Sequence, residues 1–225
     1  MTAHALPPTW PMYRALVGVG MLCGLMIAVV FQGTRPIIER NRAEALERAI
    51  FAVLPAATSR TTFTLNDAQQ FIAADVPGEQ RVHAGYDTEG RLVGVAIEAA
   101  GMGYADTITI LYGYAPRQET IVGFRVLTSK ETPGLGDKIE TYPEFLDNFV
   151  ALDVSLDAAG AALRNPVVTV KQGQKTEPWQ VDGITGATIS SKAIGDMLAT
   201  STDYWLPIIN AQLETLAAGG GDEES

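Results

Sequence analysis

Residues 106–128 read DTITILYGYAPRQETIVGFRVLT. In each half of this stretch large apolar side chains alternate with mostly smaller or polar ones, and Pro116-Arg117-Gln118 separates the halves. Alternation with a period of two is typical of a strand with one buried face, and a proline at such a break is typical of a turn. The stretch therefore predicts two antiparallel strands, 106–114 and 120–128, at the centre of the fold.

The sequence on either side extends this pattern. Residues 81–87 and 91–99 predict two more strands, which Thr88-Glu89-Gly90 connects as a hairpin. The four runs predict an antiparallel meander with one buried face, and the class is α+β, an antiparallel sheet with packed helices. The other predicted elements are helices at 142–150 and 189–216 and short strands at 167–171 and 179–181. Pro207 and the stretch Ser201-Thr202-Asp203 predict a break or kink in the last helix.

An apolar segment precedes this domain. Ala15 to Phe31 carry no charge, and extension to Thr34 brings the run near the length that spans a bilayer. No Ala-x-Ala site follows, which favours a retained single-pass anchor over a cleaved secretory signal. Residues 39–54 then show helical spacing, and 66–74 favour some helix. The predicted parts are a short N-terminal segment (1–14), a transmembrane anchor (15–34), a juxtamembrane helix and connection (35–80), the globular domain (81–218) and a disordered tail (219–225).

Charge and cysteine content limit the function classes. The formal net charge is −10, and an acidic domain argues against nucleic acid as a partner. One cysteine, Cys23, and two distant histidines, His4 and His83, offer no disulfide framework, zinc site or iron–sulfur site. No metal ligands and no catalytic residues are predicted, so redox chemistry would need a bound organic cofactor or a partner.

Charge alone leaves the orientation in the membrane open. Arg14 precedes the apolar segment, whereas Arg35, Arg40, Arg42 and Arg48 follow it. The positive-inside rule, applied to these residues, would place the domain in the cytoplasm. Long domains can be exported regardless of such a bias, so both sides remain possible.

Residues 181–192, VDGITGATISSK, join a predicted turn to a predicted helix. A helix start exposes unpaired N–H groups and suits an anion, and Lys192 would add a positive charge there. Small Gly186 and Ala187 would allow another group to approach the backbone closely. The alternative is that these hydroxyl residues only cap a helix.

The whole string resembles the Asp-x-x-Ser/Thr-Gly-Ala-Thr-x-Ser/Thr pattern of the FMN-binding domain family. A second stretch, Lys130 to Lys138, reads KETPGLGDK, and Gly101-Met102-Gly103-Tyr104 lies upstream of it. The last of these lacks the third glycine of a dinucleotide fingerprint and is more typical of a glycine-rich loop. All three stretches, in this order, resemble the G subunit of the Rnf electron-transport complex. The related C subunit of the sodium-pumping NADH:quinone reductase shares them and is the alternative.

This resemblance implies a covalent cofactor and assigns residues to it. Thr188 would carry FMN as a phosphoester, which a separate flavin transferase installs from FAD with a divalent cation, and Asp182 would serve recognition or attachment. Thr185, Ser190 and Ser191 would bond the phosphate, and Lys192 would partly neutralise it. The residues expected to pack against or bond the isoalloxazine are Glu131, Thr132, Gly134 and Leu135.

The resemblance also implies a cellular setting. The chain would be an electron carrier in an ion-translocating complex of the bacterial inner membrane rather than a stand-alone enzyme. Its domain would lie on the periplasmic side, and its partners would be iron–sulfur and membrane subunits. The competing hypothesis from another class is a flavin-free anchored scaffold, whose threonines only cap a helix.

Overall fold

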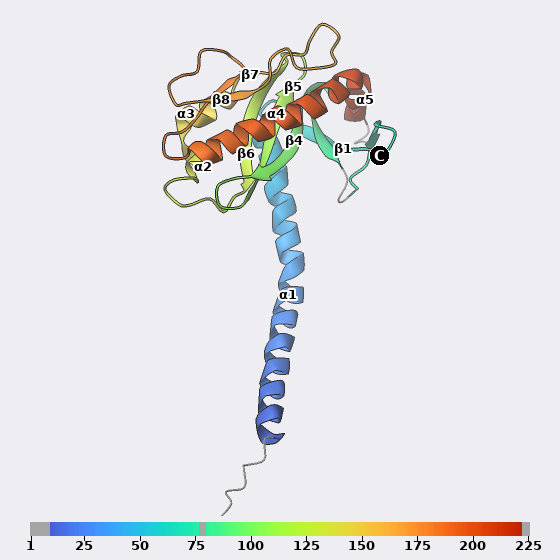
Figure 1. Cartoon of the computed structure of the whole chain (residues 1–225). Coiled ribbons are helices and arrows are strands. Elements are labelled where there is room, and N and C mark those ends of the chain that lie inside the picture. The colour runs from blue at the N-terminus through green and yellow to red at the C-terminus, as the bar shows by residue number, and fades with distance from the viewer. Residues whose placement is uncertain (1–9, 77–79, 222–225) are drawn as a thin grey trace, which may run out of the picture. The chain divides into compact units, whose positions relative to one another are not determined.

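The computed structural model describes residues 10–76 and 80–221 (Figure 1). The described residues form sixteen elements. In chain order they are α1 (Trp10–Val53), β1 (Ser59–Leu65), β2 (Phe71–Ala73), β3 (Arg81–Tyr86), β4 (Leu92–Met102), β5 (Thr107–Ala115), β6 (Thr120–Thr128), α2 (Lys138–Thr141), α3 (Pro143–Leu146), η1 (Asp147–Phe149), β7 (Leu152–Asp153), β8 (Val168–Val170), β9 (Gln180–Asp182), α4 (Thr188–Ala211), α5 (Leu213–Ala218) and η2 (Gly219–Gly221). Their strands make one seven-stranded sheet and a separate two-stranded parallel sheet of β8 and β9.

Helix α1 begins with a candidate membrane span. It is long and apolar enough to cross a membrane, and its apolar window is unburied. Residues up to Ala45 form a unit of their own, and the chain from Leu46 onward forms the second. The expected single N-terminal transmembrane helix is therefore present as a continuous helix, whereas residues 1–9 of the predicted N-terminal segment lie outside the described residues.

The second unit is built on a seven-stranded antiparallel sheet in the order β2-β1-β3-β4-β5-β6-β7. The predicted meander is confirmed from β3 to β6. The β3–β4 turn forms because the Asp87 carboxylate accepts hydrogen bonds from the N–H groups of Glu89 and Arg91, and Gly90 adopts φ +72°. The helix expected at 66–74 is wrong, because this stretch supplies the turn and β2, which pair with β1 and extend the sheet before residue 81.

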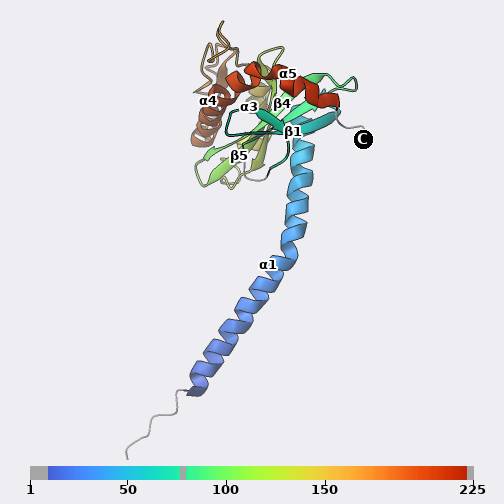
Figure 2. The ribbon, with the colours of Figure 1, turned by 90° about the vertical axis from the view of Figure 1, so that its right-hand side faces the viewer.

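Both faces of the sheet are covered, so the expectation of one buried face is wrong. On one face α4 and α5 pack over the larger core (Figure 2), which includes Tyr112, Phe124, Leu198 and Ile209. On the other face the last turn of α1 and the residue after it bury Ile50, Val53 and Leu54 against Ala96 and Leu111.

Helix α4 runs without interruption through Pro207 to Ala211. The predicted break falls instead at Gln212, which separates α4 from α5. Thr202 and Ser201 do not interrupt the helix either. The Thr202 hydroxyl donates to the Leu198 carbonyl (2.6 Å), and the Ser201 hydroxyl bonds the Tyr112 phenol (2.8 Å) beneath it. Of the predicted tail, Gly219–Gly221 forms η2, and residues 222–225 lie outside the described residues.

Candidate functional site

Thr188 is the first residue of α4, at the end of the loop that follows β9. The residue before it, Ala187, makes no side-chain cap, and the Thr188 hydroxyl reaches the Ile184 carbonyl only at 3.5 Å. Among the described residues, the backbone N–H groups of Thr188, Ile189 and Ser190 donate no hydrogen bond to a protein acceptor. The helix start therefore presents an exposed hydroxyl beside free N–H donors, which is the arrangement that an anion requires.

The four hydroxyl residues of this stretch divide into two pairs. Thr185 and Thr188 are exposed, whereas Ser190 and Ser191 are buried. The Ser191 hydroxyl accepts from the Ile184 N–H (3.3 Å) and donates to the Thr188 carbonyl (3.2 Å). Ser191 thus closes the loop onto the first turn of α4, and the phosphate contact expected of Ser190 and Ser191 remains a prediction.

Three cavities meet at Thr188. The helix cavity, about 580 Å³, lies between Ala99–Met102 at the end of β4 and the side of α4. The loop cavity, about 310 Å³, is lined by Tyr104, by Glu131 to Gly136 and by the start of α4. The polar cavity, about 390 Å³, lies between Thr169–Gln174 and Gly183–Thr185. Thr188 lines all three, so a group attached to its hydroxyl has room on every side.

The rim of the helix and loop cavities carries large apolar side chains that face solvent. Met102 is 72% exposed, Tyr104 66%, Ile189 57% and Leu135 51%. A contiguous exposed apolar patch on a folded domain is typical of a binding site. The Thr132–Leu135 turn brings Leu135 to this rim, with Gly134 at φ +78° and the Leu135 N–H donating to the Thr132 carbonyl.

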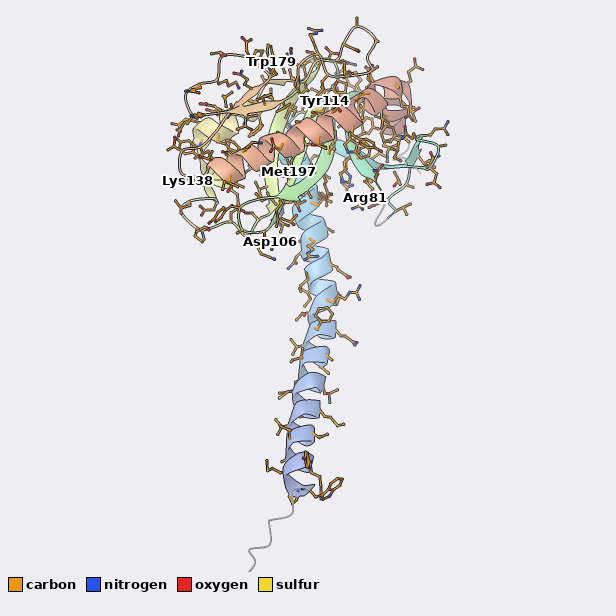
Figure 3. All side chains as sticks on the ribbon, in the orientation of Figure 1. Arg81, Asp106, Tyr114, Lys138, Trp179 and Met197 are labelled. Atoms are coloured by element: carbon orange, nitrogen blue, oxygen red, sulfur yellow. The ribbon has the colours of Figure 1, made fainter. Side chains whose placement is uncertain are left out.

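Glycines let the segments around these cavities come close together. A Cβ on Gly101 would lie 2.5 Å from Cγ of Met197, which Figure 3 shows on α4. A Cβ on Gly103 would lie 2.4 Å from the Glu131 Oε1 atom, and one on Gly136 would lie 2.5 Å from its Oε2 atom. The interpretation of 101–104 as a glycine-rich loop between strands holds only for Gly103 and Tyr104, because Gly101 and Met102 still belong to β4 and pair with β5. Close approach to Met197 and Glu131 is the reason for the two glycines.

Glu131 joins the three stretches that the sequence singled out. Its carboxylate is buried, accepts the Ala105 N–H (3.0 Å) and accepts the Ser190 hydroxyl (2.5 Å). The preceding Lys130 points elsewhere and pairs with Asp106 (2.5 Å). That hydrogen bond holds the pKa of the Asp106 carboxyl below its usual range and raises the pKa of Lys130.

The Asp182 side chain contacts a neighbouring loop, 172–174. Its carboxylate accepts the N–H groups of Gly173 (2.8 Å) and Gln174 (3.3 Å). Gln172 of the same loop accepts the Thr185 N–H (2.9 Å). Asp182 therefore orders the loop that forms one wall of the polar cavity.

Lys192 lines the helix and polar cavities and is paired with Asp196 on the next turn of α4 (2.5 and 2.8 Å). An exposed pair of this kind is weak, so Lys192 can turn towards an anion at Thr188. The residues that border these cavities without having been predicted from the sequence include Met102, Tyr104, Gln172, Ile189 and Asp196. Met102 and Tyr104 belong to the stretch 101–104 that the resemblance includes, but only the fold shows that they line cavities together with Thr188.

These residues fit an FMN group. An exposed hydroxyl and free helix N–H groups suit its phosphate, and the apolar rim suits a flat aromatic ring. Side chains at Gly101, Gly103 or Gly136 would collide with Met197 or Glu131, so these glycines keep the walls of the helix and loop cavities close together.

Comparison with known proteins points to the same group. A family model described as "FMN-binding domain" matches residues 103–202. The G subunit of the ion-translocating oxidoreductase complex of Methanosarcina acetivorans is 31% identical over 84% of this chain and 90% of its own. The G subunit from Escherichia coli K12 is 30% identical over 87% and 89%, and the G subunit from Cereibacter sphaeroides ATH 2.4.9 is 32% identical over 77% and 74%.

Two solved structures share the fold. The C subunit of the Na⁺-translocating NADH-quinone reductase from Parabacteroides distasonis superposes with a TM-score of 0.58 at 19% identity, covering 75% of this chain and 94% of that one. NqrC from Shewanella oneidensis gives a TM-score of 0.55 at 19% identity, covering 80% and 99%. At these identities the likeness concerns the fold alone.

Proposed function

Because the chain belongs to the G-subunit family of ion-translocating oxidoreductase complexes, we propose that it is a membrane-anchored electron-transfer protein that carries FMN as a phosphoester on Thr188. Membership in this family implies other subunits of such a complex as partners. Iron–sulfur and membrane subunits give and take the electrons, and a flavin transferase matures the chain.

The observation that carries this proposal is the position of Thr188. Its hydroxyl is exposed at a helix start, next to three free N–H groups, and it borders all three cavities. A threonine hydroxyl is a poor nucleophile without a base, and the described part of the chain provides none in contact with it, so a separate transferase supplies the activation. The Oγ1–P bond forms as AMP leaves FAD and the hydroxyl proton is released.

The cavities suggest how this chain would hold the cofactor. The free N–H groups, the exposed Thr185 hydroxyl and a rotated Lys192 would receive the phosphate. The turn of Thr132, Gly134 and Leu135 would cover part of the ring together with Tyr104 and Ile189. FMN supplies the electron-carrying chemistry, and these side chains fix its position and limit its contact with water.

The residues around the helix start would act indirectly. Ser191 would hold the loop of Gly186 and Ala187 against α4, and Gly186 adopts φ +86°, which favours glycine. Asp182 would contribute to recognition by the transferase through the Gly173 loop that it orders. Asp182 would thus serve maturation of the chain rather than electron transfer.

The attachment site is tested by fluorescence in a denaturing gel and by intact mass, after co-expression with a flavin transferase. The wild type should give a fluorescent band and a mass increase of one FMN phosphoester. Thr188→Val should give a dark band at the unmodified mass, because the only change is loss of the attacking hydroxyl. Thr185→Val, the matched control, should still label, and equal labelling of Thr188→Val would move the site elsewhere.

The same experiment separates the alternatives. A wild-type band that stays dark with its unmodified mass would support the flavin-free scaffold, in which the threonines only cap α4. The C-subunit alternative shares the fold, but it is disfavoured because the relatives at 30–32% identity are G subunits. Co-purification from the native membrane would distinguish the two subunits. Only the G-subunit proposal predicts that the other subunits of an ion-translocating oxidoreductase complex co-purify with the chain.

A further inference from the structure

Glu131 is a buried carboxylate without a cationic partner in the part of the chain that the structure describes. It is 6% exposed, and the only basic residue next to it in sequence, Lys130, is paired with Asp106. Burying a charge without hydrogen bonds is costly, so the groups that Glu131 does contact determine why it is there. Those groups are one backbone N–H, of Ala105, and one hydroxyl, of Ser190.

The two contacts tie together segments that are far apart in sequence. Ala105 lies in the β4–β5 loop, whose exposed Tyr104 forms part of the loop cavity. Ser190 lies in the first turn of α4, two residues after Thr188. Glu131 itself is held by the Ser129 hydroxyl, which accepts its N–H (3.2 Å). One carboxylate therefore fixes the distance between the first turn of α4 and the β4–β5 loop that carries Tyr104.

The packing leaves Glu131 little freedom to move. Gly103 and Gly136 approach its two oxygens so closely that an added Cβ on either would overlap them. Because the carboxylate is enclosed and each of its oxygens accepts one hydrogen bond, a displacement of the first turn of α4 would have to break the bond from Ser190. Hydrogen bonds to a charged group are stronger than those between neutral groups.

We propose that Glu131 is a positioning residue, which holds the first turn of α4 and the β4–β5 loop in register so that Thr188 faces the loop cavity, and which keeps a fixed negative charge beside that cavity. Its hydrogen bonds with Ser190 and Ala105 carry this role, and the contact with the isoalloxazine that the family resemblance implies for Glu131 stays a separate prediction. This inference rests on the proposed function and deepens it, because it names what prepares the attachment site before any flavin is present.

The positioning role is tested on the full-length chain made without a transferase. Hydrogen exchange should accelerate in peptides covering 101–106 and 184–191 in both Ser190→Ala and Glu131→Ala. Glu131→Gln should stay near the wild type, since its amide can accept from Ala105 and donate to Ser190. Glu140→Gln, on an exposed position of α2, is the matched control. Unchanged exchange in Ser190→Ala and Glu131→Ala would overturn the positioning role, whether or not the chain carries flavin.

Attachment kinetics give the functional readout of positioning. The rate of flavin incorporation by the transferase should fall about tenfold in Ser190→Ala, the equivalent of one lost hydrogen bond to a charged group. Glu131→Gln should largely restore the wild-type rate, and Glu131→Ala should not. A wild-type rate in Ser190→Ala would overturn the proposal, whereas a wild-type chain that takes no covalent flavin would instead refute the proposed function.

The charge is tested by the midpoint potential of the loaded protein. Glu131→Gln removes a negative charge while keeping the shape of the site, so the added electron is less disfavoured and the potential should rise. Ser190→Ala keeps the charge and should shift the potential less than Glu131→Gln does. Equal potentials in the wild type and Glu131→Gln would overturn the claim of a fixed charge at Glu131.

Discussion

The hydroxyl residues of this site have different roles, and whether a hydroxyl residue is exposed or buried determines its role. Thr185 and Thr188 face solvent, whereas Ser190 and Ser191 are enclosed and bonded within the protein. Thr188, Ser190 and Ser191 lie in the first turn of α4, where neighbouring residues point in different directions, and Thr185 lies in the loop before it. The exposed hydroxyls and the enclosed ones are therefore separated by their positions in this loop and the first turn of α4.

Burial also affects two tyrosines of β5. Burial raises the pKa of Tyr114 to about 12, with a smaller contribution from the nearby Glu119 carboxylate, and burial raises the pKa of Tyr112 as well. The pKa of an unfolded tyrosine is about 10, so the folded state holds the phenolic proton more tightly. The stabilisation is complete below about pH 10 and is lost as the pH rises towards about 12.

The pH dependence is measured by urea unfolding at pH 8, 10 and 11.5. The wild type should lose stability steeply above pH 10, and Tyr114→Phe should lose less over the same range because it has no phenol to ionise. Tyr104→Phe, at an exposed position, should follow the wild-type profile. Parallel profiles for the wild type and Tyr114→Phe would contradict the burial argument.

At the scale of elements, glycines on one face of the sheet make room for the end of α1. Gly85 and Gly94 lie opposite each other on β3 and β4, and Gly113 and Gly123 lie opposite each other on β5 and β6. A Cβ on Gly113 would lie 2.2 Å from the Val53 carbonyl oxygen, and one on Gly94 would lie 2.6 Å from Cδ2 of Leu54. The helix end therefore packs directly on the backbone of the sheet.

Gly113→Ala should destabilise this unit by about 1–3 kcal/mol, because the added methyl meets a backbone carbonyl that cannot turn aside. Thr107→Ala, at an exposed position on the same strand, should change stability by no more than about 0.5 kcal/mol. Thermal and urea unfolding of the full chain in detergent measure both. Equal stabilities of the two variants would show that the helix end is not confined by the glycines.

At the scale of the whole molecule, a membrane anchor precedes an FMN-binding domain, and the side of the membrane is a prediction. The family resemblance favours the outer face, whereas the count of arginines favours the cytoplasm. Two of the arginines after the apolar segment, Arg35 and Arg40, pair with Glu39 and Glu44. These exposed pairs remove little of the bias, because acidic residues count weakly in the positive-inside rule.

Protease treatment of sealed spheroplasts decides the orientation. The domain should be digested from outside, while a cytoplasmic marker protein in the same sample stays intact. Full protection of the domain in sealed spheroplasts, with digestion after lysis, would place it in the cytoplasm and refute the proposed orientation.

Much of the fold could be predicted because it depends on local patterns. Alternation predicted β3 to β6, and helical spacing predicted α4. The stretch 59–73 was missed because β1 and β2 are defined by pairing with β3 and with each other, and their burial comes from that pairing. Pro207 was misjudged because packing against the sheet keeps α4 continuous across it.

The sequence by itself determined the type of chemistry: one hydroxyl-rich helix start, its resemblance to an FMN-binding domain, and an apolar anchor. Only the tertiary structure decided which hydroxyls are accessible, which apolar side chains surround them, and that Glu131 joins three distant stretches. The physical reason is that the types and spacing of residues are properties of the chain. Burial, cavities and hydrogen bonds between residues 59 positions apart, such as Glu131 and Ser190, exist only once the sheet brings those segments together.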